Sequence, residues 1–136
     1  MILMVANISH IIEQVELVAA TVALRSDGIM HYTFKPIEDF KIDNALEMFE
    51  TVGRIGKGKK YPTLITVNKY MNIESEVRQL WADSSINKYA SAEAMVLMNV
   101  AIKLIGNFYI QINKPSVPTQ MFTSEKLAVE WLKKYQ

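Results

Sequence analysis

The sequence contains no cysteine among its 136 residues. This absence excludes disulfide bonds, thiolate nucleophiles and zinc sites built on thiolate ligands. The apolar start at residues 1–5 is short and follows no Lys or Arg, so it does not have the pattern of a signal peptide. A chain of this kind fits a reducing compartment, and we expect a cytoplasmic protein.

Long apolar runs and a strong excess of one charge are also missing. No run approaches the roughly 18 apolar residues that a membrane helix requires, so no membrane span is expected. The formal net charge is only +1, and the largest gathering of basic residues with an aromatic residue is at 57–61. Nucleic-acid binding requires a larger basic surface, so we expect no nucleic-acid partner.

The sequence has few residues that could carry catalysis. The two histidines, His10 and His31, lie in no recognisable motif, and no Gly-x-Ser-x-Gly nucleophile elbow occurs. Clusters of His and carboxylates with metal-ligand spacing are missing too. We therefore expect a protein that is not an enzyme, with no catalytic residues, no metal site and no cofactor.

One domain is expected from a chain of this length, half of whose residues are hydrophobic. We place this domain at residues 15–136 and a separate N-terminal segment at 1–14. The apolar spacing in this segment is compatible with an amphipathic helix and equally with a strand that adds to a sheet edge. The segment is expected to pack on the core or to form an oligomer contact.

The order of strands and helices follows from apolar periodicity and turn residues. Residues 15–34 are predicted to form a β-hairpin, because Asp27-Gly28 separates two runs rich in β-formers. The elements expected after it are a helix over 44–55 with Asp43 as its N-cap, a strand over 63–67, a helix from 72 or 74 to 84, a strand over 94–98, a helix over 99–112, a strand over 119–122 and a C-terminal helix. This ββαβαβαβα order predicts an α/β fold with a mixed sheet of four to five strands and helices packed on it.

The stretch from 94 to 122 is the most distinctive part of the chain, and it contains no His and no acidic residue. The helix expected over 99–112 is apolar nearly all round. Such a helix is either buried on several sides or partly exposed to something apolar. The sequence leaves both alternatives open.

The second half of the chain also carries a set of short motifs. They are Lys59-Lys60-Tyr61-Pro62 before a strand, Ile105-Gly106-Asn107-Phe108-Tyr109, Asn113-Lys114-Pro115, Pro118-Thr119, Phe122-Thr123 and Ala128-Val129-Glu130-Trp131-Leu132. Together these motifs resemble a family of uncharacterised bacterial STAS-like domains, which are similar in fold to the anti-sigma-factor antagonists. The resemblance covers roughly residues 15–135. It implies a STAS-like domain with a regulatory or ligand-binding role.

The antagonists carry a phosphorylatable Ser, preceded by Asp, at the start of the helix that follows the third strand. The matching region here is 72–76, where Ser75 follows Glu74 rather than an Asp. A helix N-terminus favours a phosphate, but the like charges of Glu74 and Glu76 oppose it. This departure from the family pattern argues against a phosphorylation switch at Ser75.

Two functions remain as hypotheses. The first is a small regulatory or protein-interaction module that acts on a protein partner or on itself, with a homodimer expected. The second is a carrier or sensor of a small apolar or amphipathic ligand, lined by Met95, Met98, Phe108 and Tyr109. For either function, the expected ligand or partner surface comprises Asn68, Asn72, Glu74, Ser75, Arg78, Asn107, Asn113 and Lys114.

Overall fold

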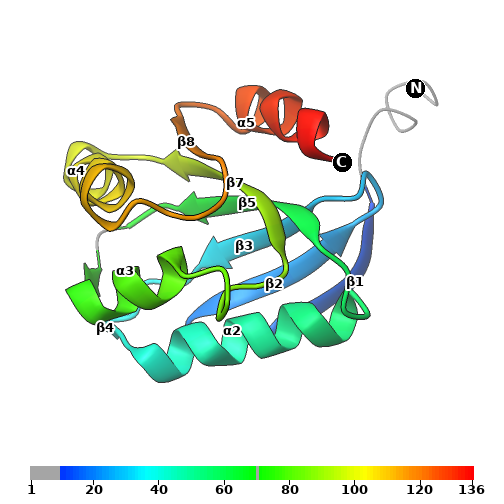
Figure 1. The fold of residues 1–136 in the computed structure, drawn as a ribbon, viewed down its shortest axis with the longest axis horizontal. Helices are drawn as coiled ribbons and strands as arrows, with labels where there is room; N and C mark the ends of the chain where they lie inside the picture. The colour runs from blue at the N-terminus through cyan, green and yellow to red at the C-terminus, as the bar shows by residue number, and fades with distance from the viewer. Residues whose placement is uncertain (1–9, 70) are drawn as a thin grey trace.

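The computed structural model describes residues 10–69 and 71–136, and it places helices on both faces of one mixed sheet (Figure 1). The sheet has six strands in the order β1-β2-β3-β5-β7-β8. These strands are β1 (Ile11–Glu16), β2 (Ala20–Arg25), β3 (Met30–Phe34), β5 (Tyr61–Val67), β7 (Ala90–Leu97) and β8 (Thr119–Phe122). Two short strands, β4 (Asp39–Phe40) and β6 (Asn72–Ile73), pair with each other in parallel.

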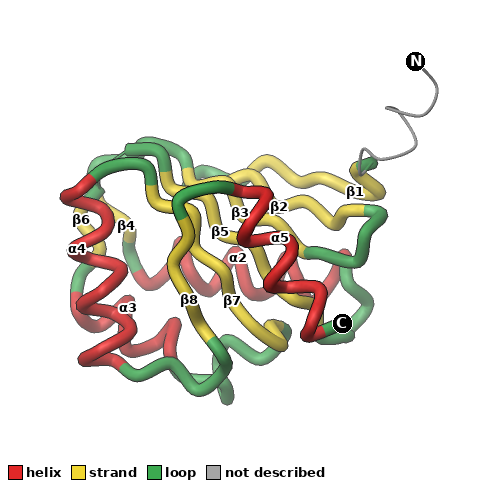
Figure 2. Tube along the Cα trace, turned by 90° about the horizontal axis from the view of Figure 1, so that it is seen from above, coloured by secondary structure: helices red, strands yellow, loops and turns green. Residues whose placement is uncertain are grey.

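In the described part of the chain, three α-helices cover one face of the sheet and one α-helix covers the other. The first face carries α2 (Ile42–Ile55), α3 (Ser75–Ala82) and α4 (Val100–Phe108), whose inner residues share the larger core. A π-helical turn, η1 (Tyr109–Asn113), continues α4. On the opposite face, α5 (Glu125–Leu132) and the 3₁₀ turn η2 (Lys133–Tyr135) cover a smaller core over β5 and β7. Figure 2 shows α3 and α4 at one end of the sheet.

The parallel part of the sheet explains this arrangement. The strand pairs β3–β5, β5–β7 and β7–β8 are parallel, and their crossovers contain α2, α3 and α4 in turn. The strand order advances in one direction, so crossovers of the same right-handed sense place all three helices on one face. The α/β class and the mixed sheet predicted from the sequence are confirmed.

The predicted hairpin is present as the antiparallel pair of β2 and β3, and Gly28 in its turn has a φ of +81°. Glycine adopts this left-handed conformation without a steric penalty. The predicted count of four to five strands is wrong, because β1 pairs with β2 as a sixth strand at the sheet edge. The side chains of β1 are largely exposed, so its sequence lacks the alternation of a half-buried strand.

Residues 11–14 of the N-terminal segment therefore adopt the strand alternative rather than the helical one, and β1 spans the boundary placed between residues 14 and 15. The oligomer contact expected of the segment 1–14 stays a prediction, and residues 1–9 of that segment lie outside the described residues.

The predicted N-cap of α2 is also wrong. The helix begins two residues earlier than predicted, at Ile42, with Lys41 as its N-cap. The side-chain oxygen of Asn44 accepts a hydrogen bond from the Lys41 backbone N–H at 2.9 Å, which closes the first turn from inside the helix. Asp43 lies in that first turn, where its negative charge is favourable to the helix dipole.

Gly53 offers a test of how closely α2 approaches the loop before β7. In the middle of a helix, alanine is more stable than glycine by about 1 kcal/mol. At this position, however, a Cβ would lie 2.6 Å from Cε2 of Tyr89. We expect Gly53→Ala to lower the free energy of unfolding by about 1 kcal/mol, because the ring must move. In a Tyr89→Ala background, the same change should raise it. Urea denaturation measures both values, and destabilisation in both backgrounds would contradict the close approach.

Candidate functional site

A cavity lies beneath α4, at the carboxyl ends of the parallel strands. The last residues of β3, β5 and β7, which are Phe34, Val67 and Leu97, form its floor. The cavity has a volume of about 80 Å³ and is lined almost wholly by apolar atoms. In open α/β sheets, ligands bind at this edge, outside the carboxyl ends of the strands. The position and the lining make this cavity the candidate ligand site.

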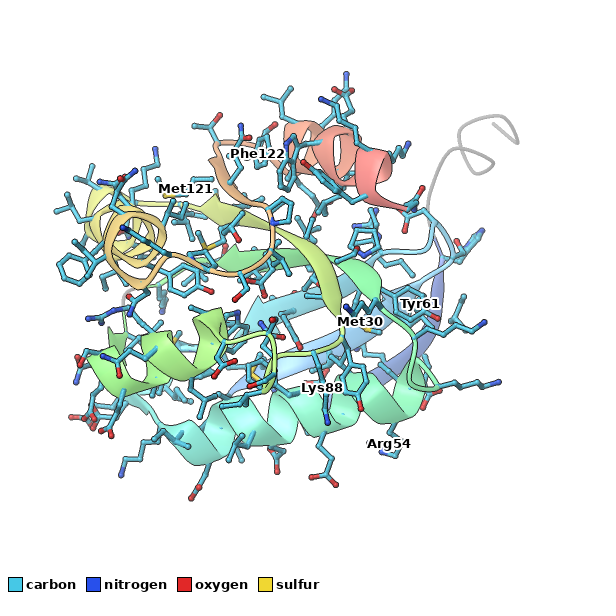
Figure 3. All side chains as sticks on the ribbon, viewed as in Figure 1. Met30, Arg54, Tyr61, Lys88, Met121 and Phe122 are labelled. Carbon is cyan, nitrogen blue, oxygen red and sulfur yellow. The ribbon has the colours of Figure 1, made fainter. Side chains whose placement is uncertain are left out.

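The side walls of the cavity come from α3 on one side and from α4 and η1 on the other. Trp81 projects from α3, while Ile102, Gly106 and Tyr109 project from α4 and η1. A Cβ on Gly106 would lie 2.5 Å from Cδ1 of Leu97 and 2.9 Å from the sulfur of Met121. The missing side chain therefore lets α4 pack closely on β7 and β8, and Figure 3 labels Met121 between β8 and α4.

A buried carboxyl group lies behind these walls. Glu93 on β7 is 1% exposed, and its Oε2 accepts hydrogen bonds from Trp81 Nε1 at 2.8 Å and Asn87 Nδ2 at 3.1 Å. The hydroxyl of Tyr109 donates to Glu93 Oε1 at 3.5 Å. Glu93 thus connects a residue of α3 with a residue of η1, the two elements that face each other across the cavity.

Burial raises the pKa of Glu93 from its ordinary value to about 7, although the hydrogen bonds from Asn87, Trp81 and Tyr109 act in the opposite direction. Burial also raises the pKa of Tyr109, and the charge of Glu93 adds to this effect. The tyrosine therefore remains a hydrogen-bond donor, while the charge of Glu93 changes near neutral pH.

Arg78 on α3 stands where the cavity meets the surface. Its Nη1 donates to the carbonyl oxygen of Ile73, and its guanidinium carbon lies 5.1 Å from the ring centroid of Phe108 on α4. Its Nε is buried and has no hydrogen-bond partner among the described residues. Arg78 also lines an adjoining, more open groove of about 300 Å³ with Leu104, Ile105 and Phe108.

The outer surface of α4 is apolar and exposed. Its exposed apolar side chains recur every four residues, so they follow one another along the same side of the helix. They are Val100 at 72% exposure, Leu104 at 66%, Phe108 at 47% and Ile112 on η1 at 61%, and we name them the α4 stripe. Helix α4 is therefore apolar both towards the cavity and towards solvent, and of the two sequence alternatives the partly exposed one holds.

The eight residues predicted for a ligand or partner surface fall into two groups. Asn68, Asn72, Glu74, Ser75 and Arg78 lie between the end of β5 and α3, whereas Asn107, Asn113 and Lys114 lie on α4, on η1 and just after it. Among these eight residues, all of which the structure describes, only Arg78 lines the cavity. Through its contact with Phe108, Arg78 connects α3 with α4 at the cavity mouth.

Ser75 lies at the start of a helix between two carboxyl groups, as the sequence indicates. Ser75 is exposed and is the first residue of α3, with Glu74 as the N-cap. A hydrogen bond with Glu76 and the negative charge of that residue raise the pKa of Glu74. The two carboxyl groups are thus close enough to repel each other on either side of Ser75.

The ligand lining predicted from sequence is partly corrected. Met95 and Tyr109 do line the cavity. Met98 does not, since it is 58% exposed, and Phe108 lines only the outer groove. Met98 follows the end of β7, and Phe108 lies on the outer side of α4 together with Leu104. Sequence reasoning missed Trp81 and Glu93 as site residues, although a lone acidic residue within the apolar run of β7 is a signal for a buried carboxyl group.

His31 does not line this cavity, and its side chain lies on the opposite face of the sheet. Its Nε2 is 2.9 Å from Thr66 Oγ1, and burial lowers its pKa. In the described part of the chain, no group of three or more His, Cys, Asp or Glu residues has the geometry to hold a metal ion. No helix formed by residues 10–69 or 71–136 is both long enough and apolar enough to cross a membrane.

Comparison with known proteins identifies structures and a family that this chain resembles. Among solved structures, the chain is similar to an uncharacterised protein of the DUF3478 family with a SpoIIAA-like fold, from Shewanella loihica PV-4. The two are 10% identical, with a TM-score of 0.53 over 93% of this chain and 96% of the other. This likeness establishes a SpoIIAA-like fold and confirms the STAS-like fold predicted from sequence.

A protein of unknown function from Arthrobacter sp. FB24 is 24% identical over 87% of this chain and 95% of its own length, with a TM-score of 0.32. None of the curated proteins matches the chain. The model of one family, described as a domain of unknown function (DUF7793), matches residues 22–136. The chain therefore belongs to the DUF7793 family.

Proposed function

We propose that this protein is a non-catalytic regulatory module that acts by pairing with a second copy of itself through the α4 stripe. The exposure of Val100, Leu104, Phe108 and Ile112 on one side of α4 and η1 is the observation that supports this proposal. A continuous row of large apolar side chains in water is typical of an interaction site. A cytoplasmic location agrees with the absence of cysteine.

The spacing of the stripe favours a second copy as the partner. Two copies of α4 that cross antiparallel, with the symmetry axis between Leu104 and Phe108, place Leu104 against Phe108 and Val100 against Ile112. Each apolar residue then meets another apolar residue, as a twofold interface requires. Lys103 is the only charged residue in α4 and η1, and this register places the two copies of Lys103 apart.

Replacement of Leu104 by glutamate tests this dimer. We expect the unmodified protein to sediment as a dimer and Leu104→Glu to sediment as a monomer, because a carboxylate would be buried opposite an apolar ring. Circular dichroism should be unchanged, since Leu104 is exposed in the single chain.

The matched control is Lys103→Glu, which introduces the same side chain on the neighbouring residue of α4, outside the stripe. This variant should remain a dimer. A monomeric unmodified protein at the highest soluble concentration would refute the homodimer, and binding of the monomer to vesicles through the stripe would identify a membrane surface as the occupant instead.

A carrier or sensor of a small apolar or amphipathic ligand is the second candidate function. The cavity beneath α4 favours it, because it lies at the ligand-binding edge of the sheet and its lining is apolar. The carrier uses the side of α4 that faces the sheet and the dimer uses its outer side, but Leu104 and Phe108 border both the stripe and the outer groove, so each candidate needs its own measurement.

A further inference from the structure

We propose that the cavity beneath α4 binds the unbranched apolar chain of a monocarboxylate, whose carboxylate pairs with Arg78 at the mouth. The inference rests on the second candidate function and names the chemical class of its ligand. It draws on three features: the shape of the cavity, the unsatisfied donor of Arg78 and the absence of an internal carboxylate partner for that arginine.

The size of the cavity selects a narrow chain. An apolar cavity of about 150 Å³ accommodates benzene, and apolar cavities do not hold water. The cavity here has a volume of about 80 Å³, which is too small for a ring, and it shares the lining residues Arg78 and Ile105 with the outer groove of about 300 Å³. The cavity alone is also too small for a long chain, so a chain of methylene groups fits with the end of its tail against Met95 and with the rest of the chain and the head group along the outer groove.

The guanidinium group of Arg78 provides the head-group site. Its Nη1 is engaged by the carbonyl oxygen of Ile73, and one of its faces is covered by the ring of Phe108. The buried Nε has no partner among the described residues. A buried donor without an acceptor is unfavourable, and more so when it is charged, so an acceptor from a ligand is favoured here.

A carboxylate is the acceptor that fits this edge. The Nε–H and the adjacent Nη2–H of an arginine point in parallel, and they match the two oxygens of a carboxylate in a bidentate pair. Arg78 forms no ion pair with any carboxylate in the described part of the chain, although Glu74 lies one helical turn away. The cation is therefore available to a ligand.

Octanoate is the probe for this site, and the methionine methyl groups are the readout. Met71 and Met95 line the cavity, whereas Met48 is buried under α2 and contacts no part of it. In ¹³C-methyl NMR of the full chain, octanoate should shift the Met71 and Met95 signals and leave the Met48 signal in place. The Met48 signal also shows whether a variant is folded, because Met48 is buried in the core.

Arg78→Gln should weaken octanoate binding by about tenfold or more, because it removes the charge-assisted bonds to the carboxylate. Lys103→Gln removes a cation from the exposed side of α4 and should change the affinity by less than about twofold. Octanol has the same chain without the carboxylate, and it should bind the unmodified protein about tenfold more weakly than octanoate.

Two outcomes would overturn the proposal. The first would leave the carrier function standing, and the second would refute it as well. The first outcome is that octanol and octanoate bind equally well, or that octanoate binds the unmodified protein and Arg78→Gln equally well. It would mean that the carboxylate is not recognised by Arg78, while the carrier function would remain. If neither compound shifts Met71 or Met95, the carrier function itself is wrong.

Discussion

Trp81→Ala is expected to lower the free energy of unfolding by about 3–5 kcal/mol, which is typical of a large aromatic side chain removed from a core. Trp81 is 8% exposed and lies at the centre of an aromatic cluster on the helix-rich face of the sheet. Its ring makes edge-on contacts with Tyr32, Phe34, Phe40 and Phe49, at centroid distances from 4.7 to 6.2 Å. Its loss would therefore enlarge the existing cavity and separate α3 from α2 and β3.

A polar effect adds to the loss of packing. The indole N–H of Trp81 donates to Glu93, so the alanine variant leaves the buried carboxyl group with one donor fewer. Breaking a hydrogen bond to a buried charged group costs about 1.5–3 kcal/mol. Trp81→Phe keeps most of the ring and removes only this donor, so its destabilisation should be smaller than that of Trp81→Ala.

The other tryptophan provides the matched control. Trp131 on α5 is half-buried and contacts Phe122 and Tyr135 on the opposite face of the sheet. Urea denaturation followed by circular dichroism should give a distinctly smaller loss for Trp131→Ala. Equal losses for the two alanine variants would contradict a central role for Trp81 in the core.

The fold is predictable from the sequence because each turn, strand and helix is specified by residues that are close together in the chain. The turn at Asp27-Gly28 specifies a hairpin wherever it lies, and the alternation of strands and helices after residue 36 dictates parallel crossovers. The edge strand β1 is harder to predict because both of its faces are largely exposed. Its residues therefore do not alternate between apolar and polar as those of a half-buried strand do. The start of β7 was misplaced for a related reason, since Glu93 interrupts an apolar run.

The candidate site was much less predictable than the fold, because it is built from long-range contacts. Sequence reasoning named Arg78, Met95 and Tyr109 but had no means of bringing them together. Their meeting depends on Gly106, whose missing side chain allows α4 to lie against Leu97 and Met121. It also depends on which side of α4 faces the sheet. A helix that is apolar all round carries no periodic signal for that choice.

In the unmodified protein, the free energy of unfolding is expected to fall as the pH rises from about 4.5 to about 7, because of Glu93. In Glu93→Gln this fall should be absent. The pKa of Glu93 is raised in the folded protein to about 7 from an ordinary value of 4.5. Within this window the folded chain keeps a proton that the unfolded chain releases, so the free energy of unfolding falls as the pH rises. Below this window both states are protonated at this group, and above it both are ionised. The loss attributable to Glu93 is about 3 kcal/mol.

Glutamine stays neutral throughout this range, and its side-chain oxygen accepts hydrogen bonds from Trp81 and Asn87 as the carboxyl group does. The difference in free energy of unfolding between Glu93→Gln and the unmodified protein should therefore grow with pH, in favour of the variant, and level off above about pH 7. His31 has a lowered pKa and adds a slope of opposite sign, but it is common to both proteins and cancels in the difference.

The control is Glu130→Gln, which removes an exposed carboxylate from α5 and should give a profile parallel to that of the unmodified protein. Urea denaturation at a series of pH values measures all three proteins. Parallel profiles for Glu93→Gln and the unmodified protein would mean that Glu93 titrates normally. A profile that diverges as expected would mean that Glu93 acquires its charge near neutral pH, between the two walls of the cavity. The charge of this one buried group would then decide how firmly α3 and η1 are held across the candidate site.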